Sequence, residues 1–394
     1  MISNSQPAPH PETPPLTILV ITLFAALMLL VTGAANWILN LTARTHPAPP
    51  TRAASAPFEM ENSQTTANLR GIHAVSGTGV AWASGANGTV LRTEDSGYMW
   101  QTCAMPPGAE KLDFRVIWAW DANTAVVMSS GPGDQSRLYK TTDGCSHWKL
   151  IYTNPDPNGF WDCLRSGPHD GFIMGDPVNG SFVLIHSTDG GTHWSADPAA
   201  ARANPDESAF AASNSSFATP DPTVHPFALA GVAPVFFGTG GKGGPRVFRL
   251  TTGAGPQRGS LQWIPVTVPV ASGTDSAGVF SLAFIDLQHG IAVGGDYTKP
   301  NDPTGTAAYT TDGGLTWPAA TKPPHGYRSA VAWDEPDKLW VTVGTNGADI
   351  SRDDGHTWTS IDNGNWNAIS LPWVVGPAGR IAKLLSLNLK PQTP

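Results

Sequence analysis

The sequence predicts an all-β protein, on the basis of its turn residues, its low charge and its aromatic content. The chain has 394 residues, of which 42 are Gly and 36 are Pro, well above average usage. Charged residues make up 14%, against roughly 25% in an ordinary globular protein. The 15 Trp and the 40% hydrophobic content argue against a disordered chain. Many tight turns between short apolar runs indicate strands and exclude a helical bundle.

The N-terminal region divides into three segments. Residues 1–15 form a tail, residues 16–41 carry no charge, and residues 42–57 are rich in Pro, Ala and Thr, as in an extended linker. About 20 apolar residues suffice to cross a bilayer, so residues 16–41 predict a single transmembrane anchor. A cleaved secretory signal is the alternative interpretation.

A motif of the form Ser/Thr-x-Asp-x-Gly-x-x-Trp recurs along the rest of the chain. Four copies are complete, and in a fifth Cys145 replaces the glycine. The aspartates and tryptophans of the five copies are Asp95 and Trp100, Asp143 and Trp148, Asp189 and Trp194, Asp312 and Trp317, and Asp353 and Trp358. In such a turn the aspartate accepts backbone N–H groups, the glycine supplies a positive φ, and the tryptophan begins the next strand. We interpret these aspartates as structural rather than as catalysts or metal ligands.

Short β-type runs precede each motif, four to a unit of roughly 40–50 residues, which is typical of propeller blades. Seven such units begin at 69–75, 114–120, 160–166, 210–217, 279–285, 327–333 and 366–371. The last unit has three strands before the chain ends, and we expect residues 58–65 to supply the fourth and close the ring. The sequence therefore predicts a seven-bladed β-propeller over residues 58–390, with six blades as the alternative.

Three segments of the first unit carry a resemblance to a known family: 69–72 (LRGI), 80–85 (VAWASG) and 88–93 (GTVLRT). Together with the motifs, which are Asp-boxes or bacterial neuraminidase repeats, they resemble the photosystem II stability/assembly factor-like family. The similarity covers about residues 58–390. It implies a seven-bladed propeller that is often membrane-anchored or secreted and that, in photosynthetic organisms, helps to assemble a membrane complex.

The resemblance also bears on the location of the propeller. Arg44 and Arg52 follow the apolar segment, whereas residues 1–15 contain no Lys or Arg, so the positive-inside rule alone places the propeller in the cytoplasm. The resemblance implies the opposite side. We expect a single-pass cell-membrane protein with a periplasmic propeller that binds another envelope protein or membrane complex.

Three cysteines rule out a dense disulfide scaffold. Cys103 and Cys145 fall on neighbouring repeats and are the expected pair if one disulfide forms outside the cytoplasm, with Cys163 left free. Three buried thiols are the alternative interpretation.

Propeller geometry narrows the search for a binding site. The inner strands of the blades begin on the face opposite the Asp-box turns, and alignment of the blade openings puts Arg70, Arg115 and Arg328 at one position. Trp161 and Asn367 hold the same position in two further blades. Acidic and aromatic candidates on this face are Asp134, Asp162, Asp176, Asp296 and Tyr297.

Three converging arginines bind a carboxylate, a phosphate or an acidic peptide. The alternative is that each arginine pairs with an aspartate and locks the blades together. A hard cation held by Asp134, Asp176 and Asp296 is a further alternative, but the histidines lack zinc-binding spacing, and we expect neither a metal nor a cofactor.

The sequence favours a non-catalytic binding module over an enzyme. Asp-box propellers include sialidases and glucan hydrolases, so an extracytoplasmic glycoside hydrolase or sialidase-like enzyme is the alternative, with an acid and a base drawn from Asp134, Asp162, Asp176 and Asp296. No recognisable catalytic set is present, and no catalytic residue is assigned. A net charge of −8 excludes a nucleic-acid partner.

Overall fold

The computed structural model describes residues 56–166, 171–197, 199, 201–220, 235–252 and 261–387. The tail, the anchor and nearly all of the linker expected over residues 1–57 lie outside these ranges. Within them, no helix has the length and apolar character needed to cross a bilayer.

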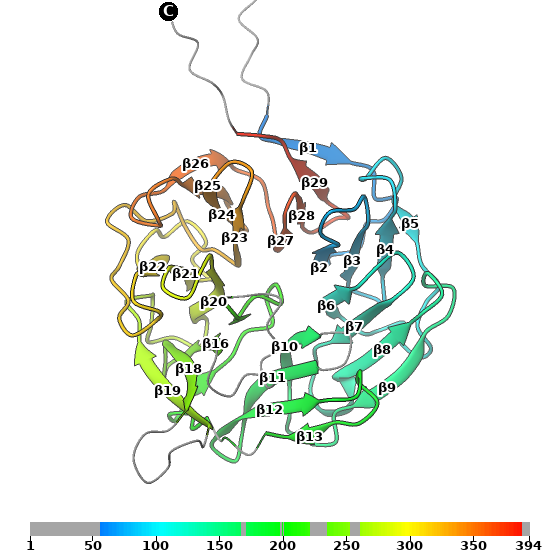
Figure 1. Ribbon diagram of the computed structural model, residues 1–394, viewed down its shortest axis with the longest axis horizontal. Coiled ribbons are helices and arrows are strands. Elements are labelled where there is room, and N and C mark those ends of the chain that lie inside the picture. The colour runs from blue at the N-terminus through cyan, green and yellow to red at the C-terminus, as the bar shows by residue number, and fades with distance from the viewer. Residues whose placement is uncertain are drawn as a thin grey trace, which may run out of the picture. The chain divides into compact units, whose positions relative to one another are not determined.

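The described residues form seven antiparallel sheets arranged as a ring, the blades of a propeller (Figure 1). Blade 1 consists of β2 (Leu69–Ala74), β3 (Ala81–Gly85), β4 (Val90–Thr93) and β5 (Gln101–Thr102). Blade 2 consists of β6 (Phe114–Ala119), β7 (Ala125–Ser129), β8 (Arg137–Thr141) and β9 (Lys149–Thr153), with the short 3₁₀ helix η1 (Gly133–Gln135) between β7 and β8. Blade 3 consists of β10 (Trp161–Ser166), β11 (Gly171–Val178), β12 (Ser181–Ser187) and β13 (Ser195–Ala196). Blade 4 consists of β15 (Phe217–Ala218), β16 (Val235–Gly238), β18 (Arg246–Thr252) and β19 (Leu261–Thr267).

The remaining blades follow the same order, with one addition. Blade 5 consists of β20 (Ala277–Phe284), β21 (Gly290–Asp296) and β22 (Ala307–Thr310), and β14 (Glu207–Ser208) and β17 (Gly240–Gly241) extend its inner edge. Blade 6 consists of β23 (Ala330–Asp334), β24 (Leu339–Gly344), β25 (Gly347–Ser351) and β26 (Thr359–Asp362). Blade 7 consists of β27 (Ala368–Ser370), β28 (Trp373–Val375), β29 (Ile381–Leu384) and β1 (Phe58–Glu61). The predicted seven-bladed propeller is confirmed.

The two ends of the ring meet in blade 7, as the sequence predicts. Strand β1 pairs antiparallel with β29, from Phe58 opposite Leu384 to Glu61 opposite Ile381. The pairing covers the edge that β29 would otherwise expose to another chain.

The core lies between blades rather than inside one of them. Each of the seven buried apolar clusters among the described residues is shared by two neighbouring blades. The Asp-box tryptophans belong to these clusters: Trp100 of blade 1 packs edge-on against Trp373 of blade 7, with ring centroids 5.4 Å apart. Each buried box tryptophan thus fastens its blade to the preceding one.

The box turns are held by their own aspartates and hydroxyl groups. In the first copy, Asp95 Oδ1 accepts the Thr93 hydroxyl (2.8 Å) and the Met99 N–H (3.0 Å), and Thr93 Oγ1 accepts the Gly97 N–H (3.1 Å). The same set recurs in the other four copies. Cys145 takes the glycine position with φ +65° and forms a disulfide with Cys103 at a Cα–Cα distance of 5.3 Å.

One expected strand is wrong. Residues 210–217 do not form the inner strand of blade 4, which is reduced to Phe217–Ala218. We call residues 209–216 the strap. Ser216 accepts the Gly238 N–H of β16 through its carbonyl oxygen (2.8 Å), whereas Asn214 and Ser215 bond to the inner strands of other blades.

Candidate functional site

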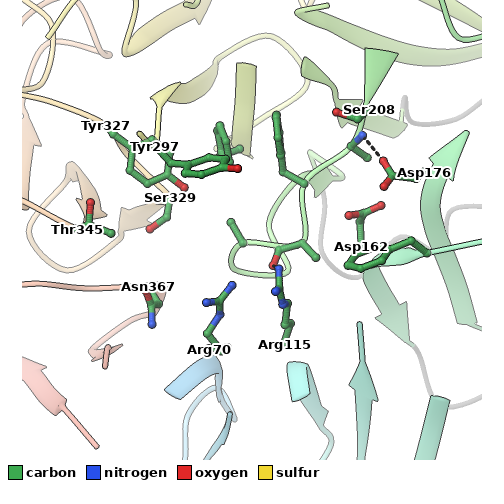
Figure 2. Close-up of a pocket in the computed structure, with 16 residues that line it drawn as sticks. Arg70, Arg115, Asp162, Asp176, Ser208, Tyr297, Tyr327, Ser329, Thr345 and Asn367 are labelled. Carbon is green, nitrogen blue, oxygen red and sulfur yellow. Dashed lines mark hydrogen bonds between the residues drawn. The ribbon is translucent and has the colours of Figure 1, made fainter. Parts of the chain in front are cut away.

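A cavity of about 530 Å³ lies where the inner strands begin (Figure 2). Every blade except blade 4 contributes to its lining, and the strap completes it. The charged lining residues are Arg70, Arg115, Asp162 and Asp176, and the aromatic ones are Phe160, Phe210, Phe280, Tyr297 and Tyr327. The cavity therefore offers two cations, two carboxyl groups and apolar walls within one space.

β-Bulges aim the cavity residues. The strand pairing skips one residue in each of four inner strands: Arg70, Arg115, Asp162 and Phe280. A further bulge in β11 skips Asp176. The extra residue of a bulge is left out of the ladder and its side chain is redirected, which turns all five side chains toward the cavity.

The residue before the bulge points into the apolar core between neighbouring blades instead. Leu69, Phe114, Trp161 and Val279 hold this position, and each is 0% exposed. A glycine on the second strand lies against the backbone of the residue that precedes Leu69. A Cβ on Gly85 would lie 2.3 Å from the carbonyl oxygen of that residue, Asn68. Where this contact recurs in another blade, it identifies the residue that is equivalent to Leu69.

The same contact shows that Arg328 is equivalent to Leu69 rather than to Arg70. In blade 6 a Cβ on Gly344 would lie 2.0 Å from the carbonyl oxygen of Tyr327, so the cavity-facing residue is Ser329. The sequence alignment is one residue out in blades 3 and 6. For that reason Trp161 and Arg328 do not line the cavity, and Asp162 and Ser329 do.

Arg328 is fully buried and held within its own blade. Its Nε donates to Asp349 Oδ2 (2.8 Å), its Nη2 pairs with the same carboxylate, and its Nη1 donates to the Tyr327 carbonyl oxygen (2.6 Å). Burial lowers the pKa of Arg328, and Asp349 counteracts this effect. Arg328 therefore stabilises the blade rather than offering a charge to a ligand.

Arg115 uses two of its three guanidinium nitrogens in hydrogen bonds to described residues. Its Nε donates to Asp113 Oδ2 (2.8 Å), and its Nη1 donates to the Ala211 carbonyl oxygen of the strap (3.2 Å). These bonds fix the guanidinium group beside the cavity.

Arg70 has no hydrogen bond or ion pair among the described residues, and its Nε is buried without an acceptor. Burial, and then the positive charge of Arg115, lower the pKa of Arg70. A cation that lacks a partner and points into a cavity is an attachment point for an anionic group.

The two carboxyl groups lie across the cavity from Arg70 (Figure 2). Asp176 Oδ1 accepts the N–H of Ala209 in the strap (2.8 Å). Asp162 is 1% exposed, and its Oδ2 has no partner among the described residues. Burial raises the pKa of Asp162 well above its usual range, and the negative charge of Asp176 raises it further, while Arg115 and the backbone N–H of Asp176 act in the opposite direction. Burial also raises the pKa of Asp176.

The other predicted site residues divide into two groups. Tyr297 and Asn367 line the cavity, and the Asn367 amide donates to the Leu69 carbonyl oxygen (2.7 Å). Asp134 and Asp296 do not line it.

The carboxylates of Asp134 and Asp296 instead bind side chains close to them in the sequence or on the same blade. Asp134 is exposed and pairs with Arg137 (3.4 Å). Asp296 accepts the hydroxyl groups of Ser276 (2.7 Å) and Thr298 (2.6 Å). Although burial favours its neutral form, these hydrogen bonds lower the pKa of Asp296 to about 2. The three aspartates considered for a cation are thus not gathered, and the described ranges contain no group of three or more His, Cys, Asp or Glu placed to hold a metal.

The strap forms one wall of the cavity and spans several blades. Asn214 Oδ1 accepts the Leu164 N–H of blade 3 (2.8 Å), and Ser213 Oγ donates to the Ser329 carbonyl oxygen of blade 6 (2.7 Å). Phe210 stacks on Phe280 of blade 5 with ring centroids 3.9 Å apart. Together with the Arg115 contact, these bonds connect four blades.

Sequence reasoning missed several lining residues. Phe280 and Ser329 are the bulge-position residues of blades 5 and 6, and the glycines of their second strands, Gly294 and Gly344, are a sequence signal that would have identified them. The strap residues had no such signal, because they occur in one blade only and read as strand.

Comparisons with known proteins place the fold. No family model matches the chain, and no curated protein matches its sequence. Among solved structures, a structure described as YCF48 bound to D1 peptide matches with a TM-score of 0.56, at 15% identity, over 84% of this chain and 97% of that one. YCF48 from Cyanidioschyzon merolae matches with a TM-score of 0.52, at 18% identity, over 84% of this chain and 99% of that one. The fold that the sequence resemblance implies is therefore confirmed by similarity to YCF48 propellers.

Proposed function

We propose that this propeller is a non-catalytic module that binds an acidic segment of a partner protein in the cavity, in an assembly role at the cell envelope. The observation that carries the proposal is Arg70, a half-buried cation without a partner among the described residues, whose Nε is buried and whose side chain lines an open cavity. A ligand carboxylate at this position would supply the partner that the fold withholds.

The cavity walls suit a peptide. Phe210, Phe280 and Tyr327 present apolar surface close to the charged groups, with Phe280 and Tyr327 in edge-to-face contact (centroids 4.8 Å apart). Aromatic and arginine side chains are the residue types enriched where proteins bind partner proteins.

The comparison with YCF48 supports a protein ligand. One of the matching structures is described as bound to a peptide, so a propeller of this fold accommodates a protein segment. The acidic character that we propose for the segment follows from Arg70.

For the location, we propose a membrane-anchored chain with a periplasmic propeller. The apolar segment 16–41 supplies the anchor. The disulfide between Cys103 and Cys145 supports the periplasmic side, because disulfides persist in oxidising compartments and are rare in the cytosol.

The test is capture of partners by the full-length chain from detergent-solubilised native membranes. We expect a specific partner whose recovery is lost with Arg70→Glu. The matched control is Arg202→Glu, which changes an exposed arginine and should leave recovery unchanged. The same proteins recovered with all three chains would contradict the proposal.

A glycoside hydrolase is the second candidate, favoured by one observation: Asp162 and Asp176 face one cavity, and the pKa of each is raised. A neutral acid near a second carboxylate is the arrangement that such enzymes use. Purified protein should then hydrolyse a chromogenic glycoside or a polysaccharide, and Asp162→Asn should abolish turnover. Absence of turnover across such substrates would eliminate this candidate.

A further inference from the structure

One oxygen of the Asp162 carboxyl group, Oδ2, is a second buried polar atom of the cavity lining that lacks a partner among the described residues. The side chain is 1% exposed, it lines the cavity, and its Oδ2 has no hydrogen-bond partner among the described residues. A bulge in β10 directs the side chain away from the strand ladder. Burying a polar group without a partner is costly, so a buried acid that a bulge aims into an open space indicates a ligand group.

The charges around Asp162 favour its protonated form. From β11 it faces Asp176, a second carboxyl group, and from β6 it faces Arg115. Arg115 gives its hydrogen bonds to Asp113 and to the strap, which leaves Asp162 without a direct cationic partner. On its own strand the neighbouring titratable group is Cys163, a buried free thiol.

We propose that Asp162 recognises the bound segment as a carboxylic acid, donating its O–H to a carbonyl or carboxylate oxygen of the ligand, so that binding is gated by pH. This inference rests on the proposed function, because it assigns a role to Asp162 in the same cavity. Arg70 attracts the anionic group, and Asp162 adds a donor that exists only while it is protonated. An apolar site can hold a carboxylic acid neutral so that it donates a hydrogen bond.

The direction of the pH dependence follows from this role. A ligand that binds the protonated form alone loses affinity about tenfold for each pH unit above the pKa of Asp162. A second ionised carboxylate at this place would also repel an acidic ligand, which acts in the same direction. The segment is therefore bound at lower pH and released as the pH rises.

The test uses a blocked aspartyl-alanine dipeptide (N-acetyl, C-amide) as the probe, with its asparaginyl counterpart as the uncharged control. Binding to the full-length chain is followed by NMR between about pH 6 and pH 9, where the probe stays ionised. We expect the affinity of the wild type to fall across this range. Asp162→Asn keeps a donor that cannot ionise, and its affinity should be retained and independent of pH. Asp162→Ala should lose affinity at every pH. The matched control Asp134→Asn, on an exposed residue of the same face, should behave as the wild type.

The outcomes separate the two proposals. If the wild type and Asp162→Asn show the same pH dependence, or if Asp162→Ala binds as the wild type does, the role of Asp162 is overturned while the binding site stands. If the aspartyl probe binds no better than the asparaginyl one, the proposed function fails. A ¹³C titration of the aspartate carboxyl groups in the unliganded chain, with Asp162 assigned from Asp162→Asn, then decides the inference. A signal that remains neutral near pH 6 supports it, and an ionised one contradicts it.

Discussion

At the scale of single residues, a displacement of one position separates a structural arginine from a ligand-binding one. Arg70 occupies a bulge and faces the cavity without a partner, whereas Arg328 occupies the preceding position and is buried against Asp349. In other blades that preceding position holds Leu69, Phe114 or Trp161. Register therefore determines the role of each arginine, as it determines which face of a sheet a side chain occupies.

This difference predicts opposite effects on stability. Arg328→Met leaves the buried Asp349 carboxylate with His325 alone and without its permanent cation, and should lower the free energy of unfolding by about 3–5 kcal/mol. Arg70→Met removes a cation that the fold does not satisfy, and should leave this free energy unchanged or raise it. Urea denaturation of the two variants measures both. Equal losses would show that Arg70 is also a structural residue.

His73 predicts a pH dependence of stability. Its Nδ1 accepts the Ala119 N–H (3.0 Å), its ring stacks on Trp118 (centroids 4.4 Å apart), and burial followed by the charge of Arg165 lowers its pKa to about 4. The unfolded chain takes up this proton near pH 6.5. Stability is then complete above about pH 6.5 and falls by about 3 kcal/mol as the pH drops to about 4.

The measurement is the difference in unfolding free energy between the wild type and His73→Gln, whose side chain also accepts a hydrogen bond. The difference should change by the stated amount between about pH 7 and pH 4. A constant difference would mean that His73 is protonated in the folded protein.

Site residues could be predicted from the sequence where they occupy equivalent positions in the repeated blades. Blade alignment brought out Arg70, Arg115 and Asn367, and the loops brought out Asp176 and Tyr297, all of which line the cavity. Arg328 was misplaced, because an arginine at an apolar position looks like a surface residue until Asp349 is seen beside it. Phe210 was not predictable as a cavity residue, because it belongs to the strap and its role depends on contacts with Phe280.

At the scale of elements, the Asp-box of blade 2 has been adapted to a disulfide. Cys145 takes the conformation with positive φ that glycine holds in the other boxes, and it ties blade 2 to Cys103 of blade 1. In this copy a residue other than glycine adopts a positive φ, and its side chain links two blades covalently.

Substitution separates the two effects. Loss of the bond, which closes a loop of 42 residues, should cost about 4 kcal/mol. The double variant Cys103→Ser with Cys145→Gly should be more stable than Cys103→Ser with Cys145→Ser by about 1 kcal/mol, because glycine adopts φ +65° without strain. Thermal and urea unfolding under non-reducing conditions compare the three chains. A glycine variant less stable than the serine variant would contradict this interpretation.

Elements could be predicted where the contacts that form them join residues close together in the sequence. The boxes follow from hydrogen bonds between residues no more than four apart, so their sequence pattern is sufficient. The strap differs, because its partners also lie in blades 2, 3, 5 and 6 and leave no mark on its own sequence. Its sequence, AFAASNSS, has no glycine or proline that would indicate a break in a strand.

At the scale of the whole molecule, the ring depends on the pairing of its two ends. Phe58 is 7% exposed and packs on Trp366 (centroids 5.3 Å apart), so β1 contributes core as well as backbone pairing. Both ends were recognisable in the sequence because the last blade lacked a strand.

Truncation tests the closure. A chain that begins at residue 56 should fold, whereas one that begins at residue 64 lacks β1. The shorter chain should lose at least about 3 kcal/mol of unfolding free energy with the burial of Phe58 and should self-associate through the exposed edge of β29. Denaturation and light scattering provide the readouts. Equal stability of the two chains would show that the ring does not need this strand.

The proposed function places the bound partner in the cavity around Arg70. Its most direct test is photo-crosslinking in native membranes from a benzoylphenylalanine in place of Tyr297, which lines the cavity and is 51% exposed. The reference position is Tyr98, which is 90% exposed in an Asp-box turn. We expect an adduct with one protein from position 297, none from position 98, and loss of the adduct when Arg70→Glu is added. An adduct that persists unchanged with Arg70→Glu, or that forms equally from position 98, would contradict it.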